Sequence, residues 1–427
     1  MDLKGKKVIV IGKKSSGISV SELLKREGAN VLCVDEKNDS EATEEIIAQS
    51  NLVVPSPGVP PQNRIILTAK RYAKPVWGEL EIGCRFLDCP KIMVTGTNGK
   101  TTVVTMIENL LTAAGYQCRA MGNIGYPVSQ VVLDGVKLDY AVIEVSSFQL
   151  EYIKELHPDI AVILNLAPDH LDRYAGYREY VETKRKLLVN MTEKDTFVFN
   201  AEDGTVRSFL SGCKAKAIPV SVTKCLSDVY IKDNYFMLGD QSLCHVKCYK
   251  LRGEHNKFNL ITALTVGNLC GVRKEHMLRL IKEYVLLPNR IEYVLTLNGV
   301  SFYNDSKGTN VHACMRALES MDGRVGLILG GSSKKEDFCD FFENIDKKVV
   351  LIAVTGDNAD VIYNAAMKMG FSDIHILPTL SGAVNFLYRS GKVDIVLLSP
   401  ACSSFDRYKN YVERGEKFKE AVYALQK

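Results

Sequence analysis

Residues 94–102 read VTGTNGKTT and join two apolar runs, one ending at Val94 and the other opening at Val103. The first run is typical of a buried strand, and the second has the spacing of a helix. A glycine turn with lysine and threonine between a strand and a helix typically wraps phosphate oxygens with backbone N–H groups. Gly96 and Gly99 enclose only two residues, whereas the usual phosphate loop has about four there. We therefore predict a nucleotide site on a shortened phosphate loop; a glycine turn with a chance lysine is the alternative.

The length of 427 residues allows about three domains. In residues 1–89, a strand over 6–12, a helix over 18–27 and a strand over 30–34 form a βαβ pattern that ends at Asp35. This is the outline of a dinucleotide-binding fold, but Lys14 stands where such a site needs a glycine. The pattern therefore disfavours NAD and leaves two alternatives: a structural turn, or a diphosphate held by Ser15 and Ser16.

Strands and helices also alternate through the predicted second domain, residues 90–286, and the third, residues 287–427. Such alternation predicts parallel sheets covered by helices on both faces. We therefore expect an α/β fold of three consecutive domains. The predicted strands lie at 140–145, 160–165, 324–329, 348–354, 373–376 and 394–398, and one of the predicted helices at 359–369.

Polar residues at the ends of the predicted strands indicate phosphate and metal chemistry. Lys100 is suited to neutralise terminal phosphates and Thr101 to ligate Mg²⁺. Glu144 interrupts an apolar strand, and a buried carboxylate normally requires a cation or other partner. It is a candidate Mg²⁺ ligand unless the strand is an edge strand that leaves it in solvent. His170 lies between two acids just past another strand, in NLAPDHLDR, and is a further candidate ligand.

Composition and charge exclude some other classes. The balance of 54 basic and 50 acidic side chains gives a net charge of +4, which is too small to indicate nucleic acid. Twelve irregularly spaced cysteines, the lack of a signal-type N-terminus and the lack of a membrane-length apolar run predict a cytoplasmic protein without membrane insertion. Cys244-His245-x-x-Cys248 resembles half a zinc site, but no second pair follows and the segment 241–251 is typical of a strand.

Five motifs taken together resemble the Mur ligase family over essentially the whole chain. They are GTNGKTT, the Glu144 strand with SSFQLE, NLAPDHLDR, GEHNKFN at 253–259 and NDSKGTN at 304–310. These ATP-dependent enzymes add amino acids to the cytoplasmic precursor of bacterial peptidoglycan. EVSSFQLE, LPNRIE at 287–292 and SPACSSFDRYKNYVERG at 399–415 are most similar to the branch that adds D-glutamate to UDP-N-acetylmuramoyl-L-alanine. The Asp-Asn-Pro-Arg motif of the branch that adds diaminopimelate or lysine is absent.

The resemblance implies a Rossmann-like UDP-binding domain, a central P-loop-type ATPase domain and a Rossmann-like domain that binds the amino acid. In this reaction the terminal carboxylate attacks the γ-phosphorus of ATP, and the amine of glutamate displaces phosphate from the acyl phosphate. Lys100, His170 and Lys184 are the implied catalytic residues.

The implied ligand contacts cover every substrate. Those of ATP are Gly96, Thr97, Asn98, Gly99, Lys100, Thr101, Thr102, Asn259, Arg290 and Asp305. The UDP-sugar would contact Ser15, Ser16, Asp35 and Gly58, with its lactyl-alanine end near Asn123, Ser146 and Gln149. D-glutamate would contact Thr309, Lys334, Ser404 and Tyr411, and two Mg²⁺ ions would be held by Thr101, Glu144, His170 and Lys184. Lys14 and Tyr411 depart from the family, which often has glycine and phenylalanine at these positions.

Lys184 needs a modification to bind a cation. It shares a helix face with Tyr180 and Tyr177, and on a buried face an ammonium must be paired or lose its proton. A neutral amine can react with CO₂ to give an anionic carbamate. The residues alone favour an exposed lysine beside Arg185 and Lys186, whereas the resemblance implies that Lys184 is carbamylated.

Two other functions fit part of the pattern. A folylpolyglutamate-synthetase-like ligase shares the loop and the ligation chemistry but has no need of a UDP site before residue 90. A non-catalytic nucleotide-binding protein could lose Glu144, His170 and Lys184, all of which are present. We expect a monomeric ligase that uses only small-molecule substrates.

Overall fold

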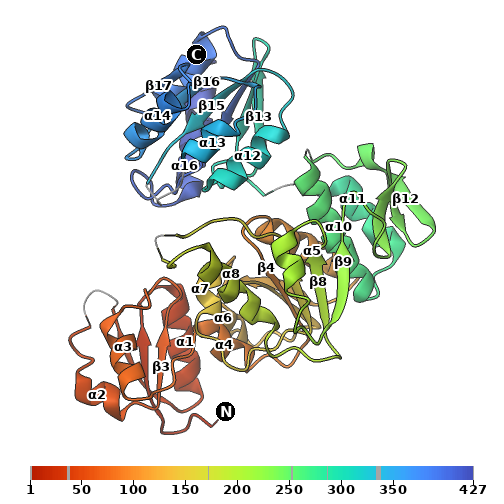
Figure 1. The fold of residues 1–427 in the computed structure, drawn as a ribbon. Coiled ribbons are helices and arrows are strands. Elements are labelled where there is room, and N and C mark those ends of the chain that lie inside the picture. Colours follow the sequence, from red (N-terminus) through yellow and green to blue (C-terminus); the bar gives the residue numbers. More distant parts are fainter. Residues whose placement is uncertain are drawn as a thin grey trace. The chain divides into compact units, whose positions relative to one another are not determined.

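The computed structural model describes residues 2–35, 39–171, 173–251, 253–285, 287–332 and 338–426. These residues form two compact units (Figure 1). The first contains Met1–Leu166, Arg178–Tyr249 and Phe258–Tyr284, and the second contains Ala167–Tyr177, Lys250–Lys257 and Val285–Lys427.

The first unit opens with a three-stranded parallel sheet in the order β2-β1-β3. Along β1, Ile9 and Ile11 face one apolar cluster while Val8 and Val10 face another, because successive side chains of a strand point to opposite faces. The sheet is therefore covered on both sides, and the predicted βαβ unit is confirmed. Its elements are β1 (Lys7–Ile11), α1 (Ser15–Arg26), β2 (Asn30–Val34), α2 (Glu44–Gln49), β3 (Leu52–Pro55), α3 (Arg64–Arg71) and α4 (Glu79–Cys84).

A second sheet of this unit has six parallel strands in the order β5-β6-β4-β7-β8-β9. Helix α5 leaves the end of β4 and packs against β4, β5 and β6. The strands are β4 (Lys91–Thr95), β5 (Cys118–Gly122), β6 (Tyr140–Glu144), β7 (Ile160–Ile163), β8 (Thr196–Asn200) and β9 (Lys216–Val220). The helices between them are α5 (Lys100–Ala113), α6 (Val128–Leu133), α7 (Ser147–Leu150), α8 (Tyr177–Arg185), η1 (Lys186–Leu188) and α9 (Gly204–Ser208).

Two buried glutamates join helix α4 to helix α6 and to the segment 154–156. Glu79 Oε1 accepts hydrogen bonds from the backbone and the hydroxyl of Ser129, at 2.7 and 2.6 Å. Glu81 accepts backbone N–H groups of residues 154–156 and pairs with Arg85 at 2.8 Å. Side chains that are each 1% exposed therefore hold residues 1–89 and the central sheet in one unit.

A small antiparallel sheet follows, which the sequence pattern did not reveal. Its strands are β10 (Val229–Lys232), β11 (Tyr235–Leu238) and β12 (Gln241–His245), and the 3₁₀ helix η2 (Val246–Cys248) follows them. The predicted strand over 241–251 is thus wrong beyond His245, whose Nδ1 accepts the Lys247 N–H at 3.1 Å and caps the turn. Helices α10 (Glu254–Leu269) and α11 (Lys274–Glu283) complete this part of the chain.

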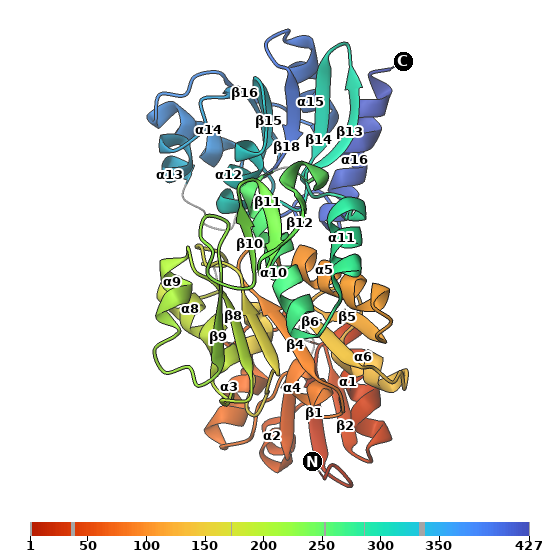
Figure 2. The same cartoon turned by 90° about the vertical axis from the view of Figure 1, so that its right-hand side faces the viewer.

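The second unit has a six-stranded sheet in the order β13-β14-β18-β15-β16-β17, whose central strands lie side by side in Figure 2. Only β13 is antiparallel to its neighbour; the other pairs are parallel. Apolar clusters lie on both faces, one beneath α13 and α14 and the other beneath α15 and α16. The strands are β13 (Glu292–Leu297), β14 (Val300–Asn304), β15 (Val325–Leu329), β16 (Val349–Val354), β17 (Ile374–Ile376) and β18 (Ile395–Leu398). The helices are α12 (Val311–Glu319), α13 (Phe338–Glu343), α14 (Ala359–Lys368), α15 (Leu380–Arg389) and α16 (Tyr411–Ala424).

The predicted α/β class with parallel, doubly covered sheets is confirmed. The domain boundaries 1–89, 90–286 and 287–427 stay a prediction. Within the described residues, no helix combines the length and the apolar character that crossing a membrane requires.

Candidate active site

The predicted phosphate loop joins β4 to α5. Gly96 and Gly99 have φ angles of +150° and +85°, conformations that favour glycine. A Cβ on Gly99 would lie 2.6 Å from Oδ1 of Asn259, so α10 packs directly against the loop. The predicted ATP contact Asn259 thus lies beside this turn. The loop leads directly into α5, whose first backbone N–H groups form an anion-binding helix N-terminus.

Asn165, just past β7, holds the loop from its other side. Its carbonyl accepts the Thr97 N–H at 2.8 Å, and its side chain bonds the N–H and the carbonyl of Asn98 at 2.9 and 3.0 Å. The ammonium of Lys100 lies within the turn, 2.9 and 2.7 Å from the carbonyls of Gly96 and Thr97. Sequence reasoning missed Asn165, although it opens the NLAPDHLDR motif.

Glu144 ends β6, an interior strand beside β4, and is 2% exposed. The alternative of a solvent-exposed edge strand is therefore wrong. Its Oε1 accepts the Asn123 amide at 2.8 Å, whereas Oε2 is buried without a hydrogen-bond partner. A buried carboxylate oxygen without a donor fits a cation. Asn123, predicted to contact the substrate, here orients Glu144.

Lys184 is 1% exposed, so the expectation of an exposed lysine, drawn from the residues alone, is wrong. Its Nζ lies 3.2 Å from Oγ1 of Thr95 and 5.0 Å from the centre of the Tyr180 ring. The Tyr180 hydroxyl is in turn 2.9 Å from Oγ1 of Thr97 in the phosphate loop. The helix face shared by Lys184 and Tyr180 therefore points to the core beside the end of β4.

Ser146 and Gln149, predicted to contact the substrate, form a capping box at the start of α7. The Gln149 side chain accepts the Ser146 N–H at 2.9 Å, and the Ser146 hydroxyl is 3.0 Å from the same oxygen. Both residues thus have a local role at the end of β6. Thr101 and Thr102 lie in the first turn of α5, within the predicted loop.

The glycine turn after β1 is tightly closed. A Cβ on Gly17 would lie 1.8 Å from the Gly12 carbonyl, and one on Gly12 would lie 2.6 Å from Oγ of Ser56. That Oγ is buried without a hydrogen-bond partner and points to the turn. Ser15 and Ser16 begin α1, Asp35 follows β2, and Gly58 lies two residues past Ser56. Sequence reasoning missed Ser56, for which the SPG triplet was the available signal.

His170 belongs to the second unit and has a left-handed φ of +55°. Its Nε2 lies 3.7 Å from Asp169, whose carboxylate also accepts the Asn310 amide at 3.2 Å. The neighbouring Asp172 lies outside the described residues. Within the described parts of the chain, no three His, Cys, Asp or Glu side chains form a metal-binding group. The predicted cation ligands include only one such residue in the first unit, Glu144.

Arg290 and Asp305 lie close together in the second unit. Asp305 Oδ1 accepts the Ile291 N–H at 3.3 Å, and Oδ2 accepts the Ser399 hydroxyl at 2.7 Å. Burial raises the pKa of Asp305 to about 7, against the opposing effects of the Ser399 hydrogen bond and the Arg290 charge. The carboxylate therefore changes its charge near neutral pH.

Three of the four predicted contacts of D-glutamate lie in described parts of the second unit. Thr309 follows β14, Ser404 is 2% exposed, and Tyr411 begins α16 with the Lys307 ammonium 4.0 Å from its ring centre. Lys334 lies outside the described residues; Ser332, the last described residue before it, donates its N–H to Ser403 at 2.9 Å.

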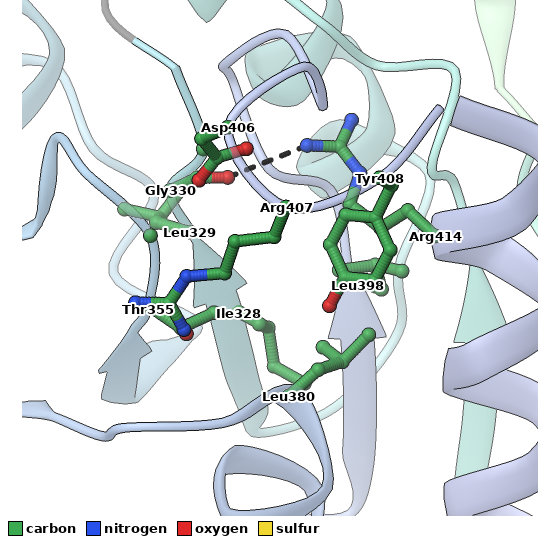
Figure 3. A pocket seen from close by; sticks show the side chains of 12 residues that line it. Ile328, Leu329, Gly330, Thr355, Leu380, Leu398, Asp406, Arg407, Tyr408 and Arg414 are labelled. Atoms are coloured by element: carbon green, nitrogen blue, oxygen red, sulfur yellow. Dashed lines mark hydrogen bonds between the residues drawn. The ribbon is translucent and has the colours of Figure 1, made fainter. Parts of the chain in front are cut away.

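A small pocket lies beyond the ends of β15, β16 and β18 (Figure 3). Arg414 reaches its wall and donates to the carbonyl of Gly330 at 3.4 Å. Asp406 accepts the Asp357 N–H at 3.2 Å through one oxygen, while Oδ1 is buried without a hydrogen-bond partner. None of the predicted substrate residues that the structure describes lines this pocket.

Comparisons with known proteins match both units. Residues 94–267 match the Mur ligase middle domain, and residues 289–402 match the Mur ligase glutamate ligase domain. The chain is 35% identical over 450 residues to UDP-N-acetylmuramoylalanine–D-glutamate ligase of Caldanaerobacter subterraneus, covering 100% of both proteins. It is 36% identical over 454 residues to the protein of the same name in Thermoanaerobacter pseudethanolicus, again covering 100% of both.

Solved structures show the same fold at low sequence identity. A pseudomurein peptide ligase type C from Methanothermus fervidus has a TM-score of 0.63 and 16% identity, covering 99% of this chain and 100% of its own. The UDP-N-acetylmuramate–alanine ligase of Thermotoga maritima has a TM-score of 0.60 and 16% identity, covering 99% and 100%. Folylpolyglutamate synthase of Mycobacterium tuberculosis also scores 0.60 at 16% identity but covers 81% of this chain and 92% of its own. With its matched domains and its full-length relatives, the chain belongs to the Mur ligase family.

Proposed function

We propose that the chain is an ATP-dependent ligase that joins D-glutamate to UDP-N-acetylmuramoyl-L-alanine in the synthesis of the peptidoglycan precursor. The observation that carries this proposal is the identity of 35% over the full length of a relative that bears this enzyme's name. The phosphate loop beside the buried Glu144 supports it, because ligation driven by ATP needs both a phosphate cradle and a cation ligand.

The reaction activates a carboxylate, which is a poor electrophile. The terminal alanine carboxylate attacks the γ-phosphorus of ATP, and ADP leaves. The amine of glutamate then attacks the carbonyl carbon of the acyl phosphate, so that an amide bond forms and inorganic phosphate and a proton are released. Negative charge accumulates on the transferred phosphoryl group, so donors held in advance around it lower the barrier. The N–H groups in the first turn of α5 and the Lys100 ammonium are the donors that this chain offers.

The cation requirement fits the residues present. Bound Mg²⁺ supplies charge neutralisation at the phosphates. Thr101 and Glu144 would hold it, and the unpartnered Oε2 of Glu144 supports that assignment. We further propose that two Mg²⁺ ions bind, and that His170 and a carbamylated Lys184 are their additional ligands. The burial of Lys184 supports the carbamate, because desolvation favours the neutral amine that reacts with CO₂.

The substrate contacts follow the three predicted domains. We assign the diphosphate to the turn of Ser15 and Ser16, to which we add Ser56, with Asp35 and Gly58 on the nucleoside side. Asn123, Ser146 and Gln149 would contact the lactyl-alanine end. On the nucleotide, Asn259, Arg290 and Asp305 would contact the adenine and ribose side. D-glutamate would be held by Thr309, Lys334, Ser404 and Tyr411. We expect the enzyme to act as a monomer in the cytoplasm.

The test is phosphate release from ATP by the full chain with UDP-N-acetylmuramoyl-L-alanine. D-glutamate, L-glutamate and no amino acid are compared side by side, and release that depends on D-glutamate supports the proposal. A pteroate substrate in place of the UDP-sugar tests the folate alternative, and release with pteroate alone would overturn the assignment.

Carbamylation has its own test. The protein is stripped of CO₂ and given ¹³C-bicarbonate, and a carbamate carbon resonance should appear together with activity. Lys184→Ala should lose both. If the unaltered protein gives no resonance and its activity does not respond to bicarbonate, the modification does not occur.

A further inference from the structure

Two residues with left-handed backbone conformations flank Arg290. Asn289 has a φ of +68° and Ile291 a φ of +47°. Asparagine adopts this region at small cost, but a β-branched residue there is an outlier that the surrounding structure must hold in place. The turn therefore stores strain beside Arg290, chiefly at Ile291. Contacts of Asn304 and Glu292, which we call the clamp, hold its backbone.

Asn304, at the end of β14 and 0% exposed, contributes the centre of that clamp. Its amide nitrogen lies 2.9 Å from Oδ1 of Asn289, 3.1 Å from Oε2 of Glu292 and 3.5 Å from the Gly415 carbonyl. Its oxygen accepts the Ser306 N–H at 3.1 Å. Three acceptors face the nitrogen and one donor faces the oxygen, so the amide fits in one orientation only.

Glu292 completes the clamp from the other end of the turn. Its Oε2 accepts the Asn289 N–H at 2.9 Å, and its Oε1 lies 3.3 Å from the ammonium of Lys419. A charge-assisted hydrogen bond of this kind is stronger than a neutral one. The Glu292 carboxylate thus accepts hydrogen bonds both from the backbone of Asn289 and from Asn304, which holds the Asn289 side chain.

The clamp also leaves no room for movement behind the turn. A Cβ on Gly415 would lie 1.7 Å from Oδ1 of Asn289, so helix α16 approaches that side chain as closely as a glycine allows. On the other flank, Asp305 accepts the Ile291 N–H at 3.3 Å. The backbone N–H groups on both sides of Arg290 are therefore hydrogen-bonded to carboxylates, that of Asn289 to Glu292 and that of Ile291 to Asp305.

We propose that Asn304 and Glu292 are positioning residues that hold Arg290 in the conformation with which it binds the nucleotide. The proposal rests on the assignment of Arg290 to ATP in the proposed function. Neither residue needs to touch the ligand. They act through the 289–291 turn, so that Arg290 binds without first ordering a strained backbone.

The test replaces the clamp's donor with an acceptor of the same shape. Asn304→Asp keeps the oxygen that accepts Ser306 but turns a second oxygen toward three acceptors. We expect the KM for ATP and the calorimetric Kd for ADP to rise about tenfold, which corresponds to about 1.4 kcal/mol. The KM values for both other substrates and kcat should stay near those of the parent. A purely structural role would instead lower the amount of active enzyme without separating the substrates.

The matched control is Asn298→Asp, the same change at an exposed asparagine with a φ of +49° in the next turn, which should leave the ATP constants unchanged. If Asn304→Asp does not fold, Glu292→Ala is measured in its place with the same expectation. A folded clamp variant with unchanged KM and Kd for nucleotide overturns the inference alone, provided that Arg290→Ala weakens nucleotide binding. If Arg290→Ala has no effect, the assignment of Arg290 to ATP falls and the inference with it.

Discussion

The phosphate loop and the Arg290 turn each present one basic side chain from a backbone with positive φ angles, but they reach that conformation by different means. The loop uses Gly96 and Gly99, which adopt such angles without a Cβ penalty. The Arg290 turn uses Asn289 and Ile291, which require a buried network around Asn304 to hold them. The residue types of the phosphate loop determine its backbone conformation, whereas residues outside the Arg290 turn determine that of the turn.

This difference determines how each turn responds to substitution. The glycine loop should be sensitive at its backbone, because a Cβ strains φ and collides with Asn259. The Arg290 turn should be sensitive at residues remote in sequence, such as Asn304 and Glu292, which bond its backbone and side chains. The following predictions test the comparison in order of decreasing effect.

Lys100→Ala should cause the largest loss. The change removes the charge that we propose stabilises the transferred phosphoryl group, so we expect kcat to fall by about 10²–10³-fold. Phosphate-release assays measure it, with Lys137→Ala, an exposed surface lysine, as the control. An equal loss in the control, or a change confined to the KM for glutamate, would show that Lys100 does not act on the phosphates.

Glu144→Gln should come next. The substitution keeps the shape of the side chain and removes the negative charge of a carboxylate whose Oε2 is buried without a hydrogen-bond partner. We expect the Mg²⁺ concentration for half-maximal activity to rise by about ten- to a hundredfold, while the melting temperature without nucleotide does not fall. Titration of Mg²⁺ and thermal unfolding measure the two effects. A variant that melts much earlier but turns over normally would mean that Glu144 is structural.

Gly99→Ala tests the backbone of the loop directly. Its φ of +85° makes the methyl group cost about 1–2 kcal/mol of stability, and the contact with Asn259 should add to that and raise the KM for ATP. The control is Gly115→Ala at the other end of α5, with a φ of +94° and no atom within 4 Å of the added Cβ. Equal effects of the two changes on ATP would show that Asn259 does not constrain the loop.

Asp305→Asn should have the smallest effect on turnover, and we expect its effect in the pH dependence of stability. Burial raises the pKa of Asp305 from 3.8 to about 7, so the folded state binds this proton more tightly than the unfolded chain. Its contribution to stability is complete below pH 3.8 and is lost as the pH rises toward 7. We expect the variant to show a flatter melting temperature across that range. A slope identical to the parent's would assign the pH dependence to other groups.

Sequence reasoning predicted the main strands and helices because their apolar patterns repeat over several residues. The predicted strand over 30–34 matches β2, and that over 140–145 matches β6 to within one residue. It missed the antiparallel β10–β12 sheet, whose short strands carry weaker patterns. It also missed Ser56 and Asn165, because each acts on a turn more than 35 residues away in the chain.

The residue types alone determined the phosphate loop, since glycines between a strand and a helix permit few other structures. They also determined the α/β class, because a regular alternation of strands and helices has few packing solutions. Burial was decided only by the tertiary structure. Lys184 is followed in the sequence by two further basic residues, Arg185 and Lys186. Only packing against Thr95 and Tyr180 places its amine in the core. The same holds for the Arg290 turn, since no local pattern predicts that Ile291 adopts a left-handed conformation. The hydrogen bonds of Asn304, Glu292 and Asp305 stabilise that turn, and they come from residues that only folding brings together.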